Sequence, residues 1–224
     1  MPSLLLRCLA IIVLAAAPAA FADDAWTPLL QPASLDGWTR ADGTPAKPGG
    51  WTIAGGVLSL AKPGAGDLVS AREFGDCEIA FEWQVAPGAN SGLKYRVRRT
   101  GKDWIGCEYQ LLDDARHANG KVPKTSAASL YDVLAPDPAK PAKPAGEWNE
   151  SRIVARGTAL EHWLNGQCVL RADTASPAFA AAVAASKFRT TQGFAKPGPG
   201  RLLIQDHGDK VALRNLRIRP LGGK

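Results

Sequence analysis

Residues 108–113, with the sequence EYQLLD, combine two carboxylates and an amide with apolar residues at alternating positions. Because successive side chains of a β-strand point to opposite faces, Glu108 and Gln110 are expected on one face and the apolar residues between them on the other. Asp113 is out of phase and joins this row only if a β-bulge lies at Leu111-Leu112. Such a row is either a solvated outer face or a site that processes carbohydrate.

Two cations precede this row. Lys94 and Arg96 share one face of the preceding expected strand. If that strand pairs with residues 106–112, a cation lies across from Glu108 or Gln110. Such a pair is either part of a site or an ordinary cross-strand salt bridge worth roughly 0.2–1 kcal/mol.

Other polar residues lie in expected loops or at strand ends. His117 follows in a polar loop, and residues 205–209, QDHGD, end a strand. There Asp206 and Asp209 can orient His207; the alternative is an Asx-turn with an exposed histidine. The adjacent pair Trp148-Asn149 offers either a plane for stacking on a sugar or a cap on the core.

Several kinds of site have no signature in this sequence. It contains no glycine-rich phosphate loop, no Gly-x-Ser-x-Gly elbow, no paired-cysteine zinc spacing and no His-x-x-x-His helix. His117, His162 and His207 are far apart along the chain and are a weak basis for a metal site. We therefore expect no metal or other cofactor.

The first 22 residues are typical of a secretory signal peptide. Arg7 forms a short basic region, Leu9 to Ala17 an apolar core, and Ala20-Phe21-Ala22 a small-x-small cleavage site. An uncleaved membrane anchor is the alternative, but this apolar run is shorter than the roughly 20 residues needed to span. We expect cleavage after Ala22, one domain over residues 23–224, and a periplasmic or extracellular location.

Charge and cysteine content narrow the partners. The formal net charge is +6, but Lys and Arg are scattered and no nucleic-acid motif is present, so the charge is interpreted as favouring solubility. No second apolar segment could span a membrane. Cys77, Cys107 and Cys168 remain after cleavage, an odd count that leaves at least one unpaired. They allow one disulfide in an oxidising compartment, or are small buried residues within strands.

The pattern of the rest of the chain predicts an all-β sandwich. Turn signals recur roughly every eight to twelve residues, and Asn165-Gly166 is a type I′ hairpin signal. The one expected helix lies near 177–187, with Ser176 as its cap and Pro177 at its first position. Pro136 to Gly146 is interpreted as a surface loop. Strands are expected at 51–53, 57–60, 77–83, 93–97, 106–112, 151–156, 159–164, 167–171, 201–205 and 211–219, with a further candidate at 129–133.

Seven short motifs occur together and in order. They are Leu35-Asp36-Gly37-Trp38, Asn90-Ser91-Gly92, Glu108 to Asp113, Lys143 to Asn149, His162 to Gly166, Gln205 to Asp209 and Leu213 to Ile218. Each is weak alone, but together they resemble the 3-keto-disaccharide hydrolase domain family over nearly the whole mature chain.

The resemblance implies a concanavalin A-like jelly roll of two curved antiparallel sheets, and action on glycosides whose glucose C3 hydroxyl is already a ketone. A base would remove the C2 proton, the C1 substituent would leave, and water would add back. Under this hypothesis Glu108 or His207 is the base, and Asp113, His117 or Asp206 orients it or serves as acid. The expected substrate contacts are Gln110, Lys94, Arg96, Asn90, Tyr131, Trp148 and Asn149.

The same stretch also resembles laminarinase-like retaining glycosidases, which carry Glu-x-Asp-x-x-Glu on a bulged strand. Here Gln110 replaces the central carboxylate and Asp113 replaces the last glutamate. This departure argues against double displacement, which needs two carboxyls roughly 5–5.5 Å apart. An ordinary retaining glycosidase and a non-catalytic carbohydrate-binding module remain the alternatives to a keto-glycoside hydrolase or lyase.

Overall fold

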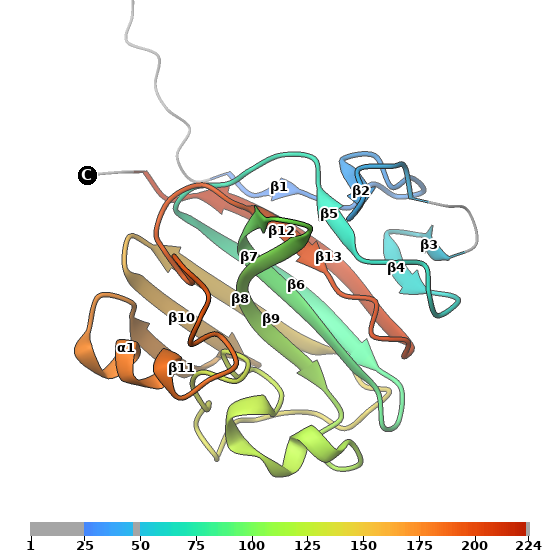
Figure 1. Cartoon of the computed structure of the whole chain (residues 1–224). Helices are drawn as coiled ribbons and strands as arrows, with labels where there is room; N and C mark the ends of the chain where they lie inside the picture. The colour runs from blue at the N-terminus through green and yellow to red at the C-terminus, as the bar shows by residue number, and fades with distance from the viewer. Residues whose placement is uncertain (1–24, 47–49, 223–224) are drawn as a thin grey trace, which may run out of the picture.

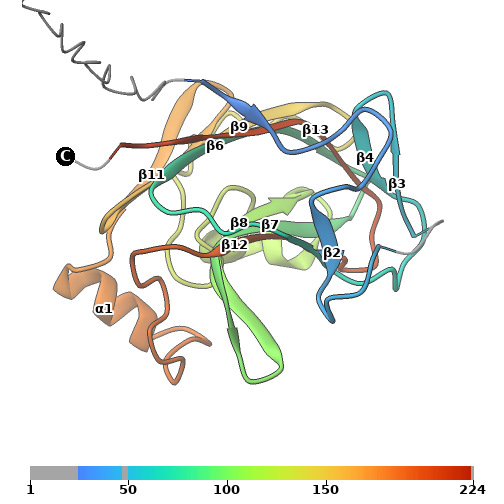
Figure 2. The ribbon, with the colours of Figure 1, turned by 90° about the horizontal axis from the view of Figure 1, so that it is seen from above.

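The computed structural model describes residues 25–46 and 50–222, which form two antiparallel sheets packed face to face (Figures 1 and 2). The larger sheet has the strand order β11-β10-β9-β6-β13-β4-β3, with β1 paired to β13. Its strands are β1 (Thr27–Pro28), β3 (Trp51–Ala54), β4 (Val57–Leu60), β6 (Cys77–Val85), β9 (Asn149–Arg156), β10 (Ala159–Leu164), β11 (Gln167–Asp173) and β13 (Val211–Pro220).

The smaller sheet has the order β2-β5-β12-β7-β8. Its strands are β2 (Trp38–Arg40), β5 (Leu68–Ser70), β7 (Asn90–Thr100), β8 (Asp103–Leu112) and β12 (Arg201–Ile204). The prediction of an all-β jelly-roll sandwich with one short helix is therefore confirmed. The signal-peptide prediction falls on residues 1–22, which lie outside the described residues.

Local sequence signals account for several elements. Asn165 and Gly166 have φ angles of 45° and 86°, as the predicted type I′ turn requires, and they join β10 to β11. Helix α1 spans Pro177–Ala184, and the hydroxyl of Ser176 accepts a hydrogen bond from the Phe179 amide, as predicted for a cap.

The core lies between the sheets and is filled by alternate side chains of both. Its largest fully buried members include Trp83, Phe81, Tyr95, Tyr109 and Leu111. Burying one such aliphatic or phenylalanine side chain contributes roughly 1.5–3 kcal/mol. The outward face of β7 and β8 carries the polar Glu108 and Gln110, and also Val97 and Trp104, which pack with Val69 and Leu203 in a smaller hydrophobic cluster.

The predicted bulge at Leu111-Leu112 is wrong. β7 and β8 pair without a shift from Asn90↔Leu112 to Tyr95↔Cys107, and the register shifts only between Tyr95 and Arg98. Both leucines are buried, so Leu112 closes the strand over the core, and Asp113 begins the next loop. Asp113 is therefore not in the row formed by Glu108 and Gln110.

Residues 129–133 form a turn with isolated bridges instead of the candidate strand, because Ala128 and Asp132 have φ angles of 63° and 61°. The Tyr131 amide nevertheless donates to the Glu108 carbonyl, and the Ala128 amide donates to the Gln110 carbonyl. This segment therefore runs alongside β8. Two short 3-10 helices, η1 (Ala118–Lys121) and η2 (Pro123–Thr125), precede it.

The three cysteines of the described part of the chain are free thiols. Cys77 and Cys107 lie buried in β6 and β8, whereas Cys168 in β11 is partly exposed. Burial raises the pKa of the Cys77 and Cys107 thiols to about 12, so both are protonated at neutral pH. Among the described residues, no helix is long and apolar enough to cross a membrane.

Candidate active site

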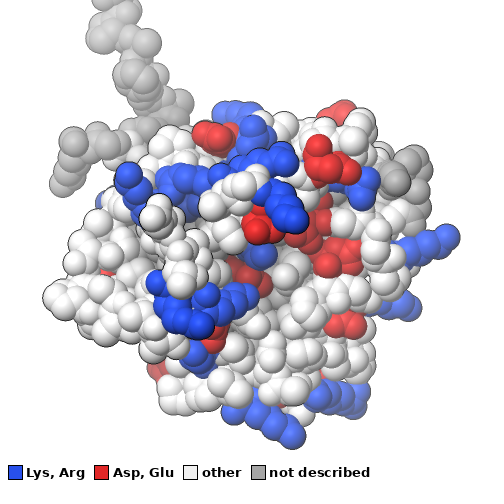
Figure 3. Space-filling view, viewed as in Figure 1, with Lys and Arg blue, Asp and Glu red and all other residues white. Residues whose placement is uncertain are grey.

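The outward face of the smaller sheet carries two neighbouring rows of residues, whose polar members are Lys94, Glu108, Asp67, Gln205 and Gln110. The pairings put Val69, Leu203, Lys94 and Glu108 side by side, from β5 through β12 and β7 to β8. Two residues along the strands, on the same face, lie Asp67, Gln205, Gly92 and Gln110. Figure 3, which views this face, shows acidic and basic side chains next to each other near its middle.

Glu108 is buried although it faces outward, with only 5% of its surface exposed. Its carboxyl lies over Gly92, where a Cβ atom would overlap Oε1 and lie 3.0 Å from Cγ. The Lys94 ammonium lies 3.9 Å from Oε2, which confirms the predicted cross-strand pair. Burial raises the pKa of the Glu108 carboxyl, while Lys94 and Lys187 oppose the rise.

A cavity of about 260 Å³ opens beside this carboxyl. It is lined by both strands of the β7–β8 hairpin and by the segment that follows α1; the lining residues include Lys94, Trp104, Glu108, Lys187 and Phe188. The hairpin bends out from the sandwich on this side, which gives the cavity one of its walls (Figure 2).

Lys187 lies at the rim of this cavity, with its ammonium 4.3 Å from the centre of the Tyr131 ring. Partial burial lowers the pKa of Lys187, whereas the Glu108 charge raises it. Burial raises the pKa of the Tyr131 phenol, with the neighbouring Glu108 carboxylate as the next cause. The structure therefore brings the predicted Tyr131 to Glu108 and adds Lys187, which the sequence analysis missed.

Asp67 is the second missed residue. It precedes β5, and its Oδ1 accepts a hydrogen bond of 2.9 Å from the Asp206 amide. Burial raises the pKa of Asp67, while Lys94 and His207 lower it. Asp67 also raises the pKa of Glu108, so the two carboxyls lie within electrostatic reach of each other.

Two of the predicted residues in the loop after β12 serve different purposes. Both oxygens of Asp206 accept hydrogen bonds from backbone amides, those of Gly66 and Gly208. His207 is half exposed, with Nδ1 4.0 Å from Asp209 Oδ2, and it is near enough for its protonated form to lower the pKa of Glu108 and of Asp67. Asp206 therefore holds the loop in place, while His207 lies at the rim of the site.

Gln110 and Asn90 form the floor beside Glu108. Both are buried, and the Gln110 amide nitrogen donates to Asn90 Oδ1 at 2.8 Å. Gln110 Oε1 is also buried and has no hydrogen-bond partner among the described residues. These two side chains therefore support the floor of the site, and they contact each other.

Asp113 and His117 are not brought to Glu108. Asp113 accepts hydrogen bonds from the Gly88 and Ala115 amides, and His117 Nδ1 accepts one from the Asn119 amide and caps η1. Five residues of extended chain separate Asp113 from Glu108, about 16 Å between their Cα atoms. The two carboxyls therefore do not form the close pair of a retaining glycosidase.

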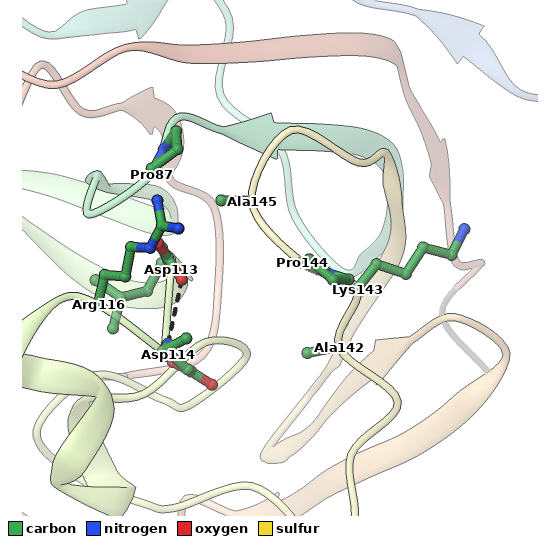
Figure 4. Close-up of a pocket in the computed structure, with 10 residues that line it drawn as sticks. Pro87, Asp113, Asp114, Arg116, Ala142, Lys143, Pro144 and Ala145 are labelled. Carbon is green, nitrogen blue, oxygen red and sulfur yellow. Dashed lines mark hydrogen bonds between the residues drawn. The ribbon is translucent and has the colours of Figure 1, made fainter.

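Asp113 instead borders a separate cavity of about 380 Å³, shown in Figure 4. Arg116 and the loop 142–145 line the same cavity. Glu108, Lys94 and Lys187 do not line this cavity. It is larger than the cavity beside Glu108, but its volume alone does not indicate catalysis.

The other predicted substrate contacts also lie elsewhere. The bulge in β7 turns Arg96 away from Lys94, and its guanidinium pairs with Asp76 at 3.2 Å. The Trp148 ring is covered by the Arg214 guanidinium at 4.1 Å, and Asn149 is buried and bonded to Lys143. Arg96, Trp148 and Asn149 therefore make contacts within the fold in this structure and do not face the Glu108 cavity.

His162, on β10, is buried in the core between the two sheets. Nδ1 donates to the Ala128 carbonyl at 2.9 Å, which requires that Nε2 accept from the Tyr95 hydroxyl at 3.0 Å. Burial lowers the pKa of His162 to about 4, so the ring is neutral. This pair of bonds fixes the segment that carries Tyr131.

The described residues contain no group of three or more His, Cys, Asp or Glu side chains arranged to hold a metal ion. The side chains around Glu108 offer acid–base and electrostatic chemistry: a buried carboxyl of raised pKa, two neighbouring cations, a phenol and a second carboxyl.

Comparison with known proteins places this arrangement in a family. The sequence model of the 3-keto-alpha-glucoside-1,2-lyase-like domain matches residues 25–219. The chain belongs to this family. The family resemblance inferred from the motifs is therefore confirmed.

Relatives of this lyase-like family agree with the assignment. A 3-keto-disaccharide hydrolase of Bacteroides thetaiotaomicron is 31% identical over 233 residues, which cover 88% of this chain and 79% of that protein. Two crystal structures from Parabacteroides distasonis, provisionally described as glycosyl hydrolases, superpose with TM-scores of 0.79 and 0.70. They are 27% and 26% identical, and the matches cover 88% of this chain and 94% and 100% of theirs.

Proposed function

We propose that this protein cleaves glycosides whose glucose unit carries a ketone at C3. The observation that carries the proposal is the buried Glu108 carboxyl, whose pKa is raised by burial and which lies 3.9 Å from the Lys94 ammonium. A carboxyl of raised pKa is a suitable base near neutral pH. The family and the named Bacteroides relative support the choice of substrate.

The C3 ketone of the substrate makes a carboxylate strong enough to act as the base. It acidifies the proton at C2, so Glu108 can remove that proton and form an enolate whose oxygen is on C3. The enolate then re-forms the ketone and expels the C1 substituent, which leaves an enone. Addition of water to the C1–C2 double bond gives the free 3-keto sugar, and the net reaction is hydrolysis.

The neighbouring cations stabilise the charge that develops. Lys94 and Lys187 line the cavity with Glu108, so an enolate oxygen in that cavity meets two ammonium groups. Fixed charges in a partly desolvated cavity stabilise a developing oxyanion more than they would in water. Tyr131 adds a hydroxyl on the same side.

The test compares a 3-keto-glucoside with its unoxidised parent, each with and without a chelator. We expect cleavage of the keto compound alone. Cleavage of the parent alone would establish an ordinary glycosidase and overturn the proposal. Binding of the keto sugar without turnover would establish a carbohydrate-binding module.

The sequence of residues 1–22 further supports a proposal that the protein acts outside the cytoplasm, in the periplasm or beyond. N-terminal sequencing of the protein recovered from cells should begin at Asp23. A protein that retains Met1 and remains in the cytoplasm would contradict export.

A further inference from the structure

We propose that Asp67 is the general acid that protonates the leaving oxygen, in partnership with Glu108 as the base. This inference rests on the proposed function and completes it. Expulsion of an alcohol from C1 requires a proton unless the alcohol is strongly acidic, and Glu108 alone cannot supply it while it holds the proton from C2.

The place of Asp67 on the sheet carries the assignment. Glu108 lies on β8, and Asp67 extends β5 by one residue on the same outward face, with β7 and β12 between them. Three strand spacings of about 4.8 Å and an offset of two residues along the strands put roughly 16 Å between the two backbones. The two residues therefore lie on the same face, on either side of β7 and β12.

The side chains of Glu108 and Asp67 both extend toward the middle of the sheet, so their carboxyls are closer together than their backbones. Glu108 lies over Gly92 on β7, and Asp67 bonds to the Asp206 amide, in the chain that continues β12. The two carboxyls are thereby brought toward each other, and Asp67 is close enough to raise the pKa of Glu108. The absence of a side chain at Gly92 gives the Glu108 carboxyl room to lie over β7.

The carboxyls of Asp206 and Asp113 already accept hydrogen bonds at both oxygens, in each case from backbone amides. Among the described residues, Asp67 accepts one hydrogen bond, at Oδ1, so Oδ2 is available to carry a proton. Burial raises the pKa of Asp67, which favours the protonated form that a general acid needs.

The protons balance over one cycle. Glu108 takes the proton from C2, the C1–O bond breaks, and the Asp67 proton passes to the departing oxygen. In the hydration step the Asp67 carboxylate takes a proton from water as the hydroxide oxygen bonds to C1, and Glu108 returns its proton to C2. Both groups end in their starting states.

The test uses two 3-keto-glucosides that differ only in the leaving group. A methyl glycoside needs an acid, whereas a 4-nitrophenyl glycoside does not. We expect Asp67→Asn to lower kcat on the methyl compound by a factor of roughly 10²–10⁴ and on the 4-nitrophenyl compound by less than about tenfold. The asparagine oxygen can still accept from the Asp206 amide, so the loop should keep its place.

Asp113→Asn is the matched control, because it neutralises a buried carboxyl that lies outside the site. It should leave the ratio of the two rates as in the unmodified protein. Asp67→Glu should restore part of the methyl glycoside activity. Equal losses on both substrates, or no loss, would overturn the assignment of Asp67. Failure of the unmodified protein to cleave either compound would instead overturn the proposed function.

Discussion

The carboxyl of Glu108 lies over the Cα atom of Gly92 on the neighbouring strand, so closely that a methyl group on Gly92 would overlap Oε1. The bare backbone of one strand thus determines where the carboxyl of the next strand can lie. Because this carboxyl is the proposed base, a residue without a side chain helps to place the chemistry.

Gly92→Ala tests this relationship. The added methyl should displace the Glu108 carboxyl and lower kcat on a 3-keto-glucoside by at least about tenfold, since misplacing a reacting group by about 1 Å can cost two orders of magnitude. Gly92 does not have a positive φ angle, so alanine suits the backbone there. Circular dichroism and steady-state kinetics measure the two effects. Unchanged kcat would mean that Glu108 does not need this position.

Glu108→Gln should lower turnover by orders of magnitude and leave the protein folded. The pKa of Glu108 is raised above its ordinary value of 4.5, so the folded state binds the proton more tightly than the unfolded state. Stability from this group is complete below about pH 4.5 and is lost as the pH rises through the folded pKa. The free energy of unfolding, measured with urea from pH 4 to 8, should therefore fall less with pH in the variant. A large loss of stability with activity retained would identify a structural carboxylate.

Lys187→Met should move the acid limb of the pH profile. Lys187 lowers the pKa of Glu108, so its removal should raise that pKa, and kcat/KM should then begin to fall at a higher pH. Lys196→Met is the control, because Lys196 does not line the cavity that contains Glu108 and lines another one. If the acid limb stays in place in both variants, Lys187 does not affect the pKa of the base.

The neutral core histidine predicts an acid-sensitive fold. The pKa of His162 falls from an ordinary 6.5 to about 4, so its contribution is complete above about pH 6.5 and is lost as the pH falls toward 4. A shift of this size corresponds to about 3 kcal/mol. In His162→Gln the free energy of unfolding should vary less between pH 4 and 6.5. An identical pH dependence in both proteins would show that another group causes the acid sensitivity.

Local patterns predicted most of the fold. The Asn165-Gly166 turn and the Ser176-Pro177 start of α1 each depend on neighbours within a few residues, and both are confirmed. The alternation in 108–111 likewise placed Glu108 and Gln110 outward, since the intervening Tyr109 and Leu111 are fully buried.

Contacts between distant residues were not predictable in this way. The true bulge is associated with Arg96, whose partner Asp76 lies twenty residues earlier, and no local pattern marks that pair. Asp67 and Lys187 are single charged residues next to a strand and a helix. The pairing of β5, β12, β7 and β8 brings Asp67 to the face of Glu108, and the segment after α1 brings Lys187 to the cavity that Glu108 lines. Trp148 and Asn149 were expected to contact substrate, but they anchor a loop instead. Aromatic and amide side chains are common in both roles, so residue type alone does not distinguish them.

The segment 128–131 also covers part of the outer edge of the smaller sheet. β8 is the last strand of its sheet, and an uncovered edge strand offers free amides and carbonyls on which another chain can form a further strand. Here the outer groups of Glu108 and Gln110 already bond to Ala128, Ser129 and Tyr131. The edge of the strand that carries the proposed base is therefore already paired at Glu108 and Gln110, so this part of it offers fewer free groups to another chain.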